Sequence, residues 1–231
     1  MKVTLSANAG ICIELAGKHI WVDALHNGKV RGFSTLDEAL QQRLLGLPAP
    51  DMMAYTHCHG DHYSRELTRL AMEKWQSTKV ILPREDFDSQ ILLQQEKHTL
   101  SLGDVTLEFV RLPHEGEEFA DVRHYGLLLE YQEKTILIPG DCALASPALK
   151  AAIGNRRIDT AILDFPWITL RKGQRFMQEV IRPEHVLVYH LPFEKDDVNG
   201  YRKSAERAVN QLPEMDIRLL KNPMQSVEIN V

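Results

Sequence analysis

Three histidines and one aspartate stand close together in the sequence HCHGDH, residues 57–62, directly after an apolar run typical of a buried strand. Residues two apart in an extended chain point to the same side, so we expect His57 and His59 to bind one ion together. The intervening glycine permits a sharp turn with unusual backbone angles, which brings Asp61 and His62 to a second ion. Imidazoles packed this closely are unfavourable unless a metal or another charge compensates. The segment therefore predicts a metal site.

Three later residues occupy positions that such a site needs. His114 and Asp141 each follow a segment that we expect to be a strand, and His190 ends another such segment. Loops at strand ends commonly carry functional side chains above a rigid scaffold. Taken alone, each of these residues is more typical of an ordinary turn or surface position than of a metal ligand, because histidine and aspartate side chains are usually at least partly exposed. Together with the first segment, they predict one site at one sheet edge.

The periodicity of apolar residues predicts a strand-rich first half and alternating strands and helices in the second half. The expected strands are residues 3–7, 11–15, 19–23, 52–56, 79–82, 98–102, 105–112, 124–131, 134–138, 160–164, 186–190, 216–220 and 225–230. The expected helices are residues 35–45, 62–75, 84–95, 147–153, 171–182 and 200–211, the first with Thr35 as its N-cap. We therefore expect an α/β fold, a four-layer α/β/β/α sandwich of two mixed β-sheets with outer helices, as a single domain over residues 1–231.

Composition places the chain among ordinary globular proteins. Of its 231 residues, 44% are hydrophobic and 26% are charged, and the net charge is −5. This balance gives no basic footprint for nucleic acid, and no apolar run is long enough to span a bilayer. The start lacks the pattern of a signal peptide, and three cysteines argue against a disulfide framework. We expect a soluble, cytoplasmic protein with a small-molecule substrate, no nucleic acid and no membrane partner; a homo-oligomer stays open.

The segment THCHGDH resembles the H-x-H-x-D-H signature of the metallo-β-lactamase superfamily. The resemblance covers nearly the whole chain, including the opening segments AGICIEL and GKHIWVDA, with Asp23 at the end of the third expected strand, where the family often has an acidic residue. The chain looks closer to the compact small-molecule hydrolases, which include ascorbate-phosphate lactonases and small phosphodiesterases, than to the nucleic-acid-processing branches. It lacks the extra domain and the long arm of those branches.

The resemblance implies a dinuclear centre in which every ligand position is filled. The implied sets are His57, His59 and His114 for one metal, Asp61, His62 and His190 for the other, and Asp141 as the bridge. The implied cofactors are two divalent ions, zinc first, with manganese or iron as alternatives. Members with a di-iron redox site carry glutamate where this chain has His59, which favours hydrolysis.

The chain is therefore predicted to be a metal-dependent hydrolase that activates water against a phosphodiester, ester or lactone. Asp61 is the candidate catalytic residue, as a ligand and a proton acceptor. Two alternatives stay open. One is a thiol dioxygenase of the same fold with a single iron at the His57, His59, His114 and Asp141 positions. The other is a non-catalytic metal-binding protein.

Other residues carry weaker patterns. Phe165 and Trp167 follow an expected strand and could form an aromatic wall of the pocket, although packing in the core is their more usual role. Arg171 and Lys172 could meet a substrate phosphate, although cations at a helix start more often face solvent. His26 is the one other histidine that we place near the site.

Overall fold

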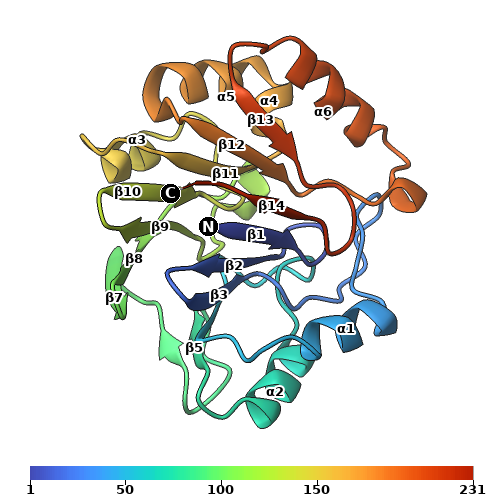
Figure 1. The fold of residues 1–231 in the computed structure, drawn as a ribbon, viewed down its shortest axis with the longest axis vertical. Helices are drawn as coiled ribbons and strands as arrows, with labels where there is room; N and C mark the ends of the chain where they lie inside the picture. The colour runs from blue at the N-terminus through green and yellow to red at the C-terminus, as the bar shows by residue number, and fades with distance from the viewer. Residues whose placement is uncertain (231) are drawn as a thin grey trace. The chain divides into compact units, whose positions relative to one another are not determined.

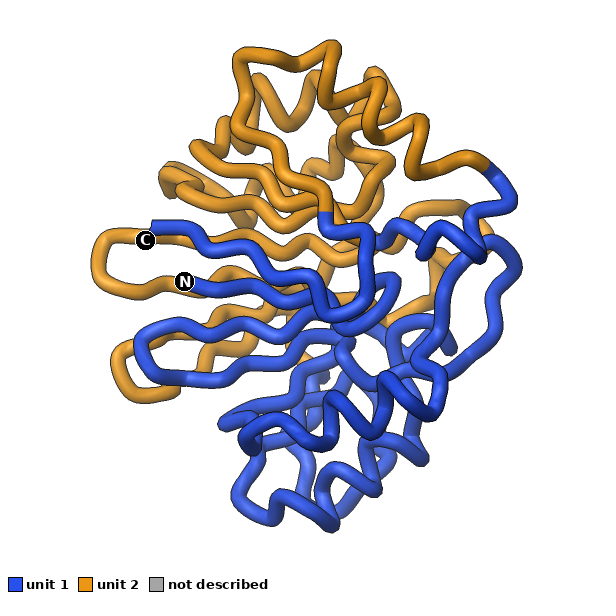
Figure 2. Tube along the Cα trace, turned by 45° about the vertical axis from the view of Figure 1, so that its right-hand side comes forward, with its two compact units in different colours: residues 1–94, 190–199, 220–230 blue, residues 95–189, 200–219, 231 orange. Residues whose placement is uncertain are grey.

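Two seven-stranded mixed β-sheets with helices form the scaffold of the computed structural model, which describes residues 1–230. Each sheet belongs to one of two compact units (Figure 2). Unit 1 contains residues 1–94, 190–199 and 220–230, and unit 2 contains residues 95–189 and 200–219. The chain therefore returns twice to unit 1. The single domain expected over residues 1–231 stays a prediction.

The sheet of unit 1 has the strand order β14-β1-β2-β3-β4-β5-β6 (Figure 1). Its strands are β1 (Lys2–Leu5), β2 (Ile11–Leu15), β3 (Lys18–Val22), β4 (Met52–Ala54), β5 (Lys79–Leu82), β6 (Ile91–Leu92) and β14 (Ser226–Glu228). Pairing is antiparallel from β14 to β3 and parallel from β3 to β6. β4 is wholly buried, as expected for a strand with parallel neighbours on both sides, and its end leads into the HCHGDH segment.

Unit 1 also contains the helices α1 (Glu38–Leu45) and α2 (Arg65–Lys74) and the 3-10 helix η3 (Glu194–Asp196). Both α-helices begin after a side chain that accepts a hydrogen bond from the first turn, Asp37 for α1 and Ser64 for α2. The prediction of Thr35 as the N-cap of the first helix is wrong. Asp37 accepts from the N–H of Leu40 at 2.9 Å, so the helix begins later than expected.

The sheet of unit 2 has the strand order β13-β12-β11-β10-β9-β8-β7 (Figure 1). Its strands are β7 (Lys97–Leu102), β8 (Val105–Arg111), β9 (Tyr125–Tyr131), β10 (Lys134–Ile138), β11 (Thr160–Asp164), β12 (His185–Tyr189) and β13 (Asp216–Leu219). Pairing is antiparallel from β7 to β10 and parallel from β10 to β13. The predicted change from consecutive strands to alternating strands and helices is therefore confirmed within this sheet.

Several short helices belong to unit 2. They are η1 (Glu117–Phe119), α3 (Pro147–Ile153), α4 (Pro166–Thr169), α5 (Arg171–Phe176), the π-helix η2 (Met177–Ile181) and α6 (Tyr201–Asn210). The helix predicted over residues 171–182 is thus α-helical only in its first half. Trp167 is fully buried and its ring centre lies 5.8 Å from that of Phe176, so it is a core residue rather than a pocket wall.

The helix predicted over residues 84–95 is wrong. The backbone N–H groups of Asp86 and Phe87 donate to the side chain of Gln90, and Arg84 pairs with the Asp86 carboxylate. These side-chain bonds replace the backbone bonds of a helix, and the segment ends in β6. The predicted α/β class with two mixed sheets is confirmed. No helix among residues 1–230 combines the length and the hydropathy that crossing a bilayer requires.

Candidate metal centre

The HCHGDH segment forms a tight turn between the end of β4 and the start of α2. The backbone N–H groups of His62 and Tyr63 both donate to the carbonyl of His59, at 3.0 and 2.9 Å. The rings of His57 and His62 then lie 4.0 Å apart, centre to centre. The turn therefore gathers the predicted ligands of this segment in one part of unit 1.

His57 and His59 lie side by side, as their spacing predicts. Nε2 of His57 is 3.0 Å from Nδ1 of His59. The hydroxyl of Thr56 donates to Asp23, so its oxygen accepts from Nδ1–H of His57 at 3.0 Å. This bond sets the tautomer of His57 and leaves the lone pair of Nε2 directed at His59. His57 is fully buried, whereas His59 is partly exposed.

Asp23, directly after β3, orients a second histidine. One oxygen of its fully buried carboxylate accepts from the backbone N–H of Thr56 at 2.8 Å. The other oxygen accepts from the Thr56 hydroxyl at 2.7 Å and from Nδ1–H of His62 at 2.9 Å. The proton of His62 is therefore held on Nδ1, and its Nε2 can serve as a ligand atom.

Asp61, His62 and His190 form a close three-residue group within unit 1. Their ligand atoms all lie within 4.8 Å of one another. Nε2 of His190 is 3.1 Å from Nε2 of His62 and 3.8 Å from the carboxylate of Asp61. His190 has a φ of +59°, and its N–H donates to the carbonyl of Asn8 at 3.0 Å. Such backbone strain in a non-glycine residue is most common at functional sites.

Gly60 lies against the backbone of Gly28. The N–H of Gly28 donates to the carbonyl of Gly60 at 2.8 Å. A Cβ atom on Gly28 would lie 2.5 Å from the carbonyl carbon and oxygen of Gly60. Gly60 itself does not adopt a positive φ. The expectation that this glycine supplies unusual backbone angles is therefore wrong. The two backbone segments lie so close together at this point that a side chain on Gly28 would clash with the backbone of Gly60.

The other two predicted ligands lie together in unit 2. His114 and Cys142 form an isolated antiparallel bridge, which brings the loop after β8 beside the loop after β10. Nε2 of His114 is 3.9 Å from the carboxylate of Asp141, and Nδ1–H of His114 donates to the carbonyl of Glu115 at 2.7 Å. The proton of His114 is therefore held on Nδ1, and its unprotonated Nε2 can serve as a ligand atom. The His114 side chain is 6% exposed and that of Asp141 is 19% exposed.

The seven predicted ligands thus fall into two groups, five residues in unit 1 and two in unit 2. Their role as ligands stays a prediction. Sequence reasoning missed Thr56 and Gly28, and it noted Asp23 only for its position. Asp23 and Gly28 contact residues far away in the sequence. Thr56 is oriented toward His57 by its bond to Asp23. Local patterns therefore carry no signal for these roles. Arg171 and Lys172 belong to neither group, because they are exposed on α5.

His26 is fully buried in unit 1, where Nε2–H donates to the carbonyl of Ala7 at 2.9 Å. Burial lowers the pKa of His26 from 6.5 to about 4, and repulsion by His62 and His190 adds to this shift. The unfolded chain therefore takes up a proton near pH 6.5 that the folded chain does not accept until about pH 4. We expect His26 alone to lower the free energy of unfolding by about 2 kcal/mol between pH 7 and pH 5.

Urea unfolding across this pH range, with excess chelator, measures the effect. The variant His26→Gln keeps a donor for the Ala7 carbonyl but removes the titration, so its stability should fall less steeply as the pH falls. His19→Gln, at a partly exposed histidine of the same unit, is the matched control. Parallel pH profiles for the wild type and His26→Gln would contradict the prediction.

Comparisons with known proteins bear on the fold. No protein-family model matches the sequence, and no curated protein matches it. Among solved structures, Igni18, a metallo hydrolase from Ignicoccus hospitalis, is 17% identical, with a TM-score of 0.71 over 100% of this chain and 98% of that one. YhfI from Bacillus subtilis, a metallo-β-lactamase fold protein, is 14% identical, with a TM-score of 0.67 over 98% of both chains.

A redox protein is also similar. CmlA, a diiron β-hydroxylase from Streptomyces venezuelae, is 17% identical, with a TM-score of 0.66 over 99% of this chain and 54% of that one. At sequence identities this low, similarity to a solved structure shows that two proteins share a fold, and it does not show that they share an activity. The resemblance predicted from THCHGDH is confirmed at that level: the chain has the metallo-β-lactamase fold.

Proposed function

We propose that the chain is a metal-dependent hydrolase whose centre combines the ligands of unit 1 with His114 and Asp141. The observation that carries the proposal is the group of Asp61, His62 and His190, whose ligand atoms lie within 4.8 Å of one another. A metal-binding histidine usually donates its other ring N–H to a carboxylate or carbonyl. His62 does so to a buried carboxylate and His114 to a carbonyl, which supports the same role for both.

The proposed ligand sets follow the resemblance. They are His57, His59 and His114 for one ion, Asp61, His62 and His190 for the other, and Asp141 as the bridge. The residues fit such ions, because neutral imidazoles meet here with carboxylates that compensate the metal charge. Zinc suits this mixture of nitrogen and oxygen donors, and manganese and iron are the alternatives.

When bound, the two ions supply water of lowered pKa and polarise the scissile group. The residues of the chain do the remaining work. Asp61 accepts the proton of the attacking water on its carboxylate, which is 13% exposed and can exchange that proton with solvent. Asp23 and Thr56 keep His62 and His57 in the tautomers whose Nε2 carries no proton and can serve as a ligand atom.

The proposed substrate is a small molecule with a phosphodiester, ester or lactone group, and the proposed location is the cytoplasm. The net charge of −5 supports a small substrate over nucleic acid, because binding of nucleic acid depends on neutralising phosphates with basic side chains.

A hydrolysis panel tests the proposal. Phosphodiesters, lactones and thioesters are offered to protein reconstituted with zinc, manganese or iron. We expect turnover of at least one class, and we expect Asp61→Ala to lose about a hundredfold or more in kcat/KM, the usual contribution of a positioned proton acceptor. Asp88→Ala, at an exposed aspartate of the same unit, is the matched control and should keep full activity.

Metal analysis separates the alternatives. Two ions per chain together with turnover support the hydrolase. A single iron with oxygen consumption on a thiol indicates the dioxygenase, and the likeness to CmlA is the reason to include iron. Bound metal without turnover of any class in the panel favours a non-catalytic metal-binding protein.

A further inference from the structure

A cavity of about 510 Å³ lies in unit 2 beside α5 and the π-helix η2. Three cationic side chains line it, those of Arg171, Lys172 and Arg175, together with the acidic side chain of Glu179. All four residues are exposed. Three positive charges and one negative charge leave this lining with a net charge of +2, although the whole chain carries −5.

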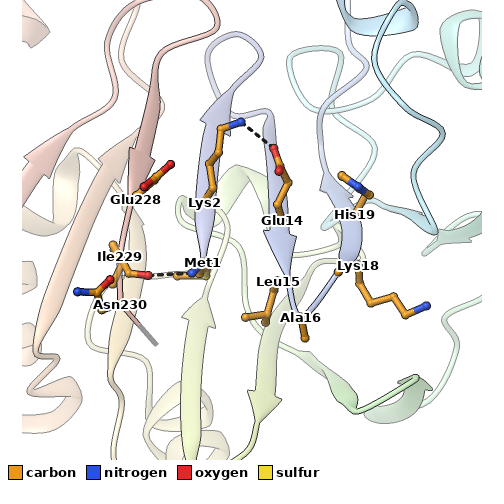
Figure 3. Close-up of a pocket in the computed structure, with 11 residues that line it drawn as sticks. Met1, Lys2, Glu14, Leu15, Ala16, Lys18, His19, Glu228, Ile229 and Asn230 are labelled. Carbon is orange, nitrogen blue, oxygen red and sulfur yellow. Dashed lines mark hydrogen bonds and ion pairs between the residues drawn. The ribbon is translucent and has the colours of Figure 1, made fainter.

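The three cations of this cavity have no ion pair within residues 1–230, unlike three other arginines of the same unit. Arg156, Arg157 and Arg218 each pair with a carboxylate. A lysine that lines a hollow of unit 1 is also paired: Nζ of Lys2 lies 2.9 Å from the carboxylate of Glu14 (Figure 3). The cavity beside α5 therefore keeps its positive charge available to a ligand.

The position of these cations is unfavourable for the chain alone. Arg171 and Arg175 are four residues apart on a helix, where like charges repel. Arg171 is the first residue of α5, whose first turn has no acidic residue, so the helix dipole opposes its charge. Glu179 follows Arg175 by four residues but forms no ion pair with it, since η2 departs from the α-helical register that pairs such residues. An anion in the cavity would offset this repulsion.

The cavity also has an apolar part. Phe176 and Val180 line it, and Ala145 adds a methyl group. Ala145 has a φ of +58°, a conformation that residues other than glycine rarely adopt. Strained residues and π-helical segments both occur preferentially at functional sites, and this cavity borders one of each. Its lining thus combines positive charge with apolar contact.

We propose that this cavity binds a small organic phosphate, with the phosphate group held by Arg171, Lys172 and Arg175 and an apolar body against Phe176 and Val180. A phosphate monoester carries close to two negative charges and three acceptor oxygens, which matches three cations better than a carboxylate does. Guanidinium groups bind such oxygens through paired hydrogen bonds. The volume suits a small ligand. The proposal does not rest on the metal centre.

Isothermal titration calorimetry with phenyl phosphate tests the proposal. The protein is first treated with chelator, because removing metal prevents phosphate from binding at the proposed metal centre. We expect saturable binding that weakens as salt is raised. Arg171→Gln and Arg175→Gln should each weaken it by about tenfold or more, since each removes a charge-assisted bond. Lys203→Gln, at an exposed lysine of α6, is the matched control and should bind like the wild type.

Several outcomes overturn the proposal. Absence of saturable binding does so, as does equal affinity of the wild type and Arg171→Gln. We expect inorganic phosphate to bind more weakly than phenyl phosphate, and equal affinities would overturn the role of the apolar lining. Asp61→Ala should bind phenyl phosphate like the wild type, so failure of the proposed hydrolase and failure of this site are separate results. Circular dichroism verifies that each variant is folded.

Discussion

Replacing Asp23 with asparagine is expected to lower the metal affinity of the chain by about ten- to hundredfold, the usual effect of removing the partner of a ligand histidine. An amide has one acceptor oxygen where the carboxylate has two. If that oxygen keeps the bond from the N–H of Thr56, the amide NH₂ faces Nδ1 of His62. His62 must then carry its proton on Nε2, the atom proposed to bind metal.

Removing the carboxylate altogether has a larger effect on stability. Asp23→Ala leaves the N–H and hydroxyl of Thr56 and Nδ1–H of His62 without their buried acceptor. Each buried donor left unsatisfied costs about 1–3 kcal/mol. We therefore expect Asp23→Ala to lower the free energy of unfolding by about 4 kcal/mol, measured by urea unfolding in the presence of chelator.

Competition with a coloured chelator measures the affinity, and ¹⁵N chemical shifts of the His62 ring report its tautomer. The matched control is Asp51→Asn, because Asp51 also accepts from a backbone N–H, that of His19 at 2.9 Å, and its partners are not predicted ligands. Its metal affinity should equal that of the wild type. Weaker metal binding by Asp23→Asn with the proton still on Nδ1 of His62 would show that Asp23 does not act through the tautomer.

Asp23 marks the boundary between what the sequence predicts and what it does not. The contact of His57 with His59 follows from local spacing in an extended segment, and the structure confirms it. The bonds that Thr56 donates to Asp23 instead join residues 33 apart in the chain. They depend on the parallel pairing of β3 with β4, which local periodicity does not specify.

The same distinction explains the errors in secondary structure. The hairpin of β7 and β8 is predicted well, because alternating apolar residues on both sides of a turn determine it locally. Residues 84–95 are of types that suit a helix, and this is why the sequence predicts a helix there. The backbone N–H groups of Asp86 and Phe87 instead donate to the side chain of Gln90. Side-chain competition of this kind depends on three-dimensional contacts and escapes periodicity.

Replacing Gly28 with alanine is expected to lower the free energy of unfolding by about 3 kcal/mol, the upper part of the usual range for overpacking, and to weaken metal binding. The added Cβ would lie 2.5 Å from the carbonyl carbon and oxygen of Gly60. Those are backbone atoms, so no side-chain rotation relieves the clash. The two segments must separate, which breaks the 2.8 Å bond from Gly28 to Gly60. Because Gly60 lies between His59 and Asp61, the displacement reaches predicted ligands of both ions.

Gly46→Ala is the matched control, because Gly46 has a φ of −81° and its added Cβ would approach other atoms no closer than 3.2 Å. Its effect should stay within about 1 kcal/mol, as for glycine-to-alanine changes at compatible positions. Urea unfolding with chelator and chelator competition are measured for both variants. Equal stability of the two would refute the role of the glycine contact. If Gly28→Ala loses stability but binds metal as the wild type does, then the contact supports the fold alone, and the ligands of the HCHGDH turn are held by Asp23 and Thr56 instead.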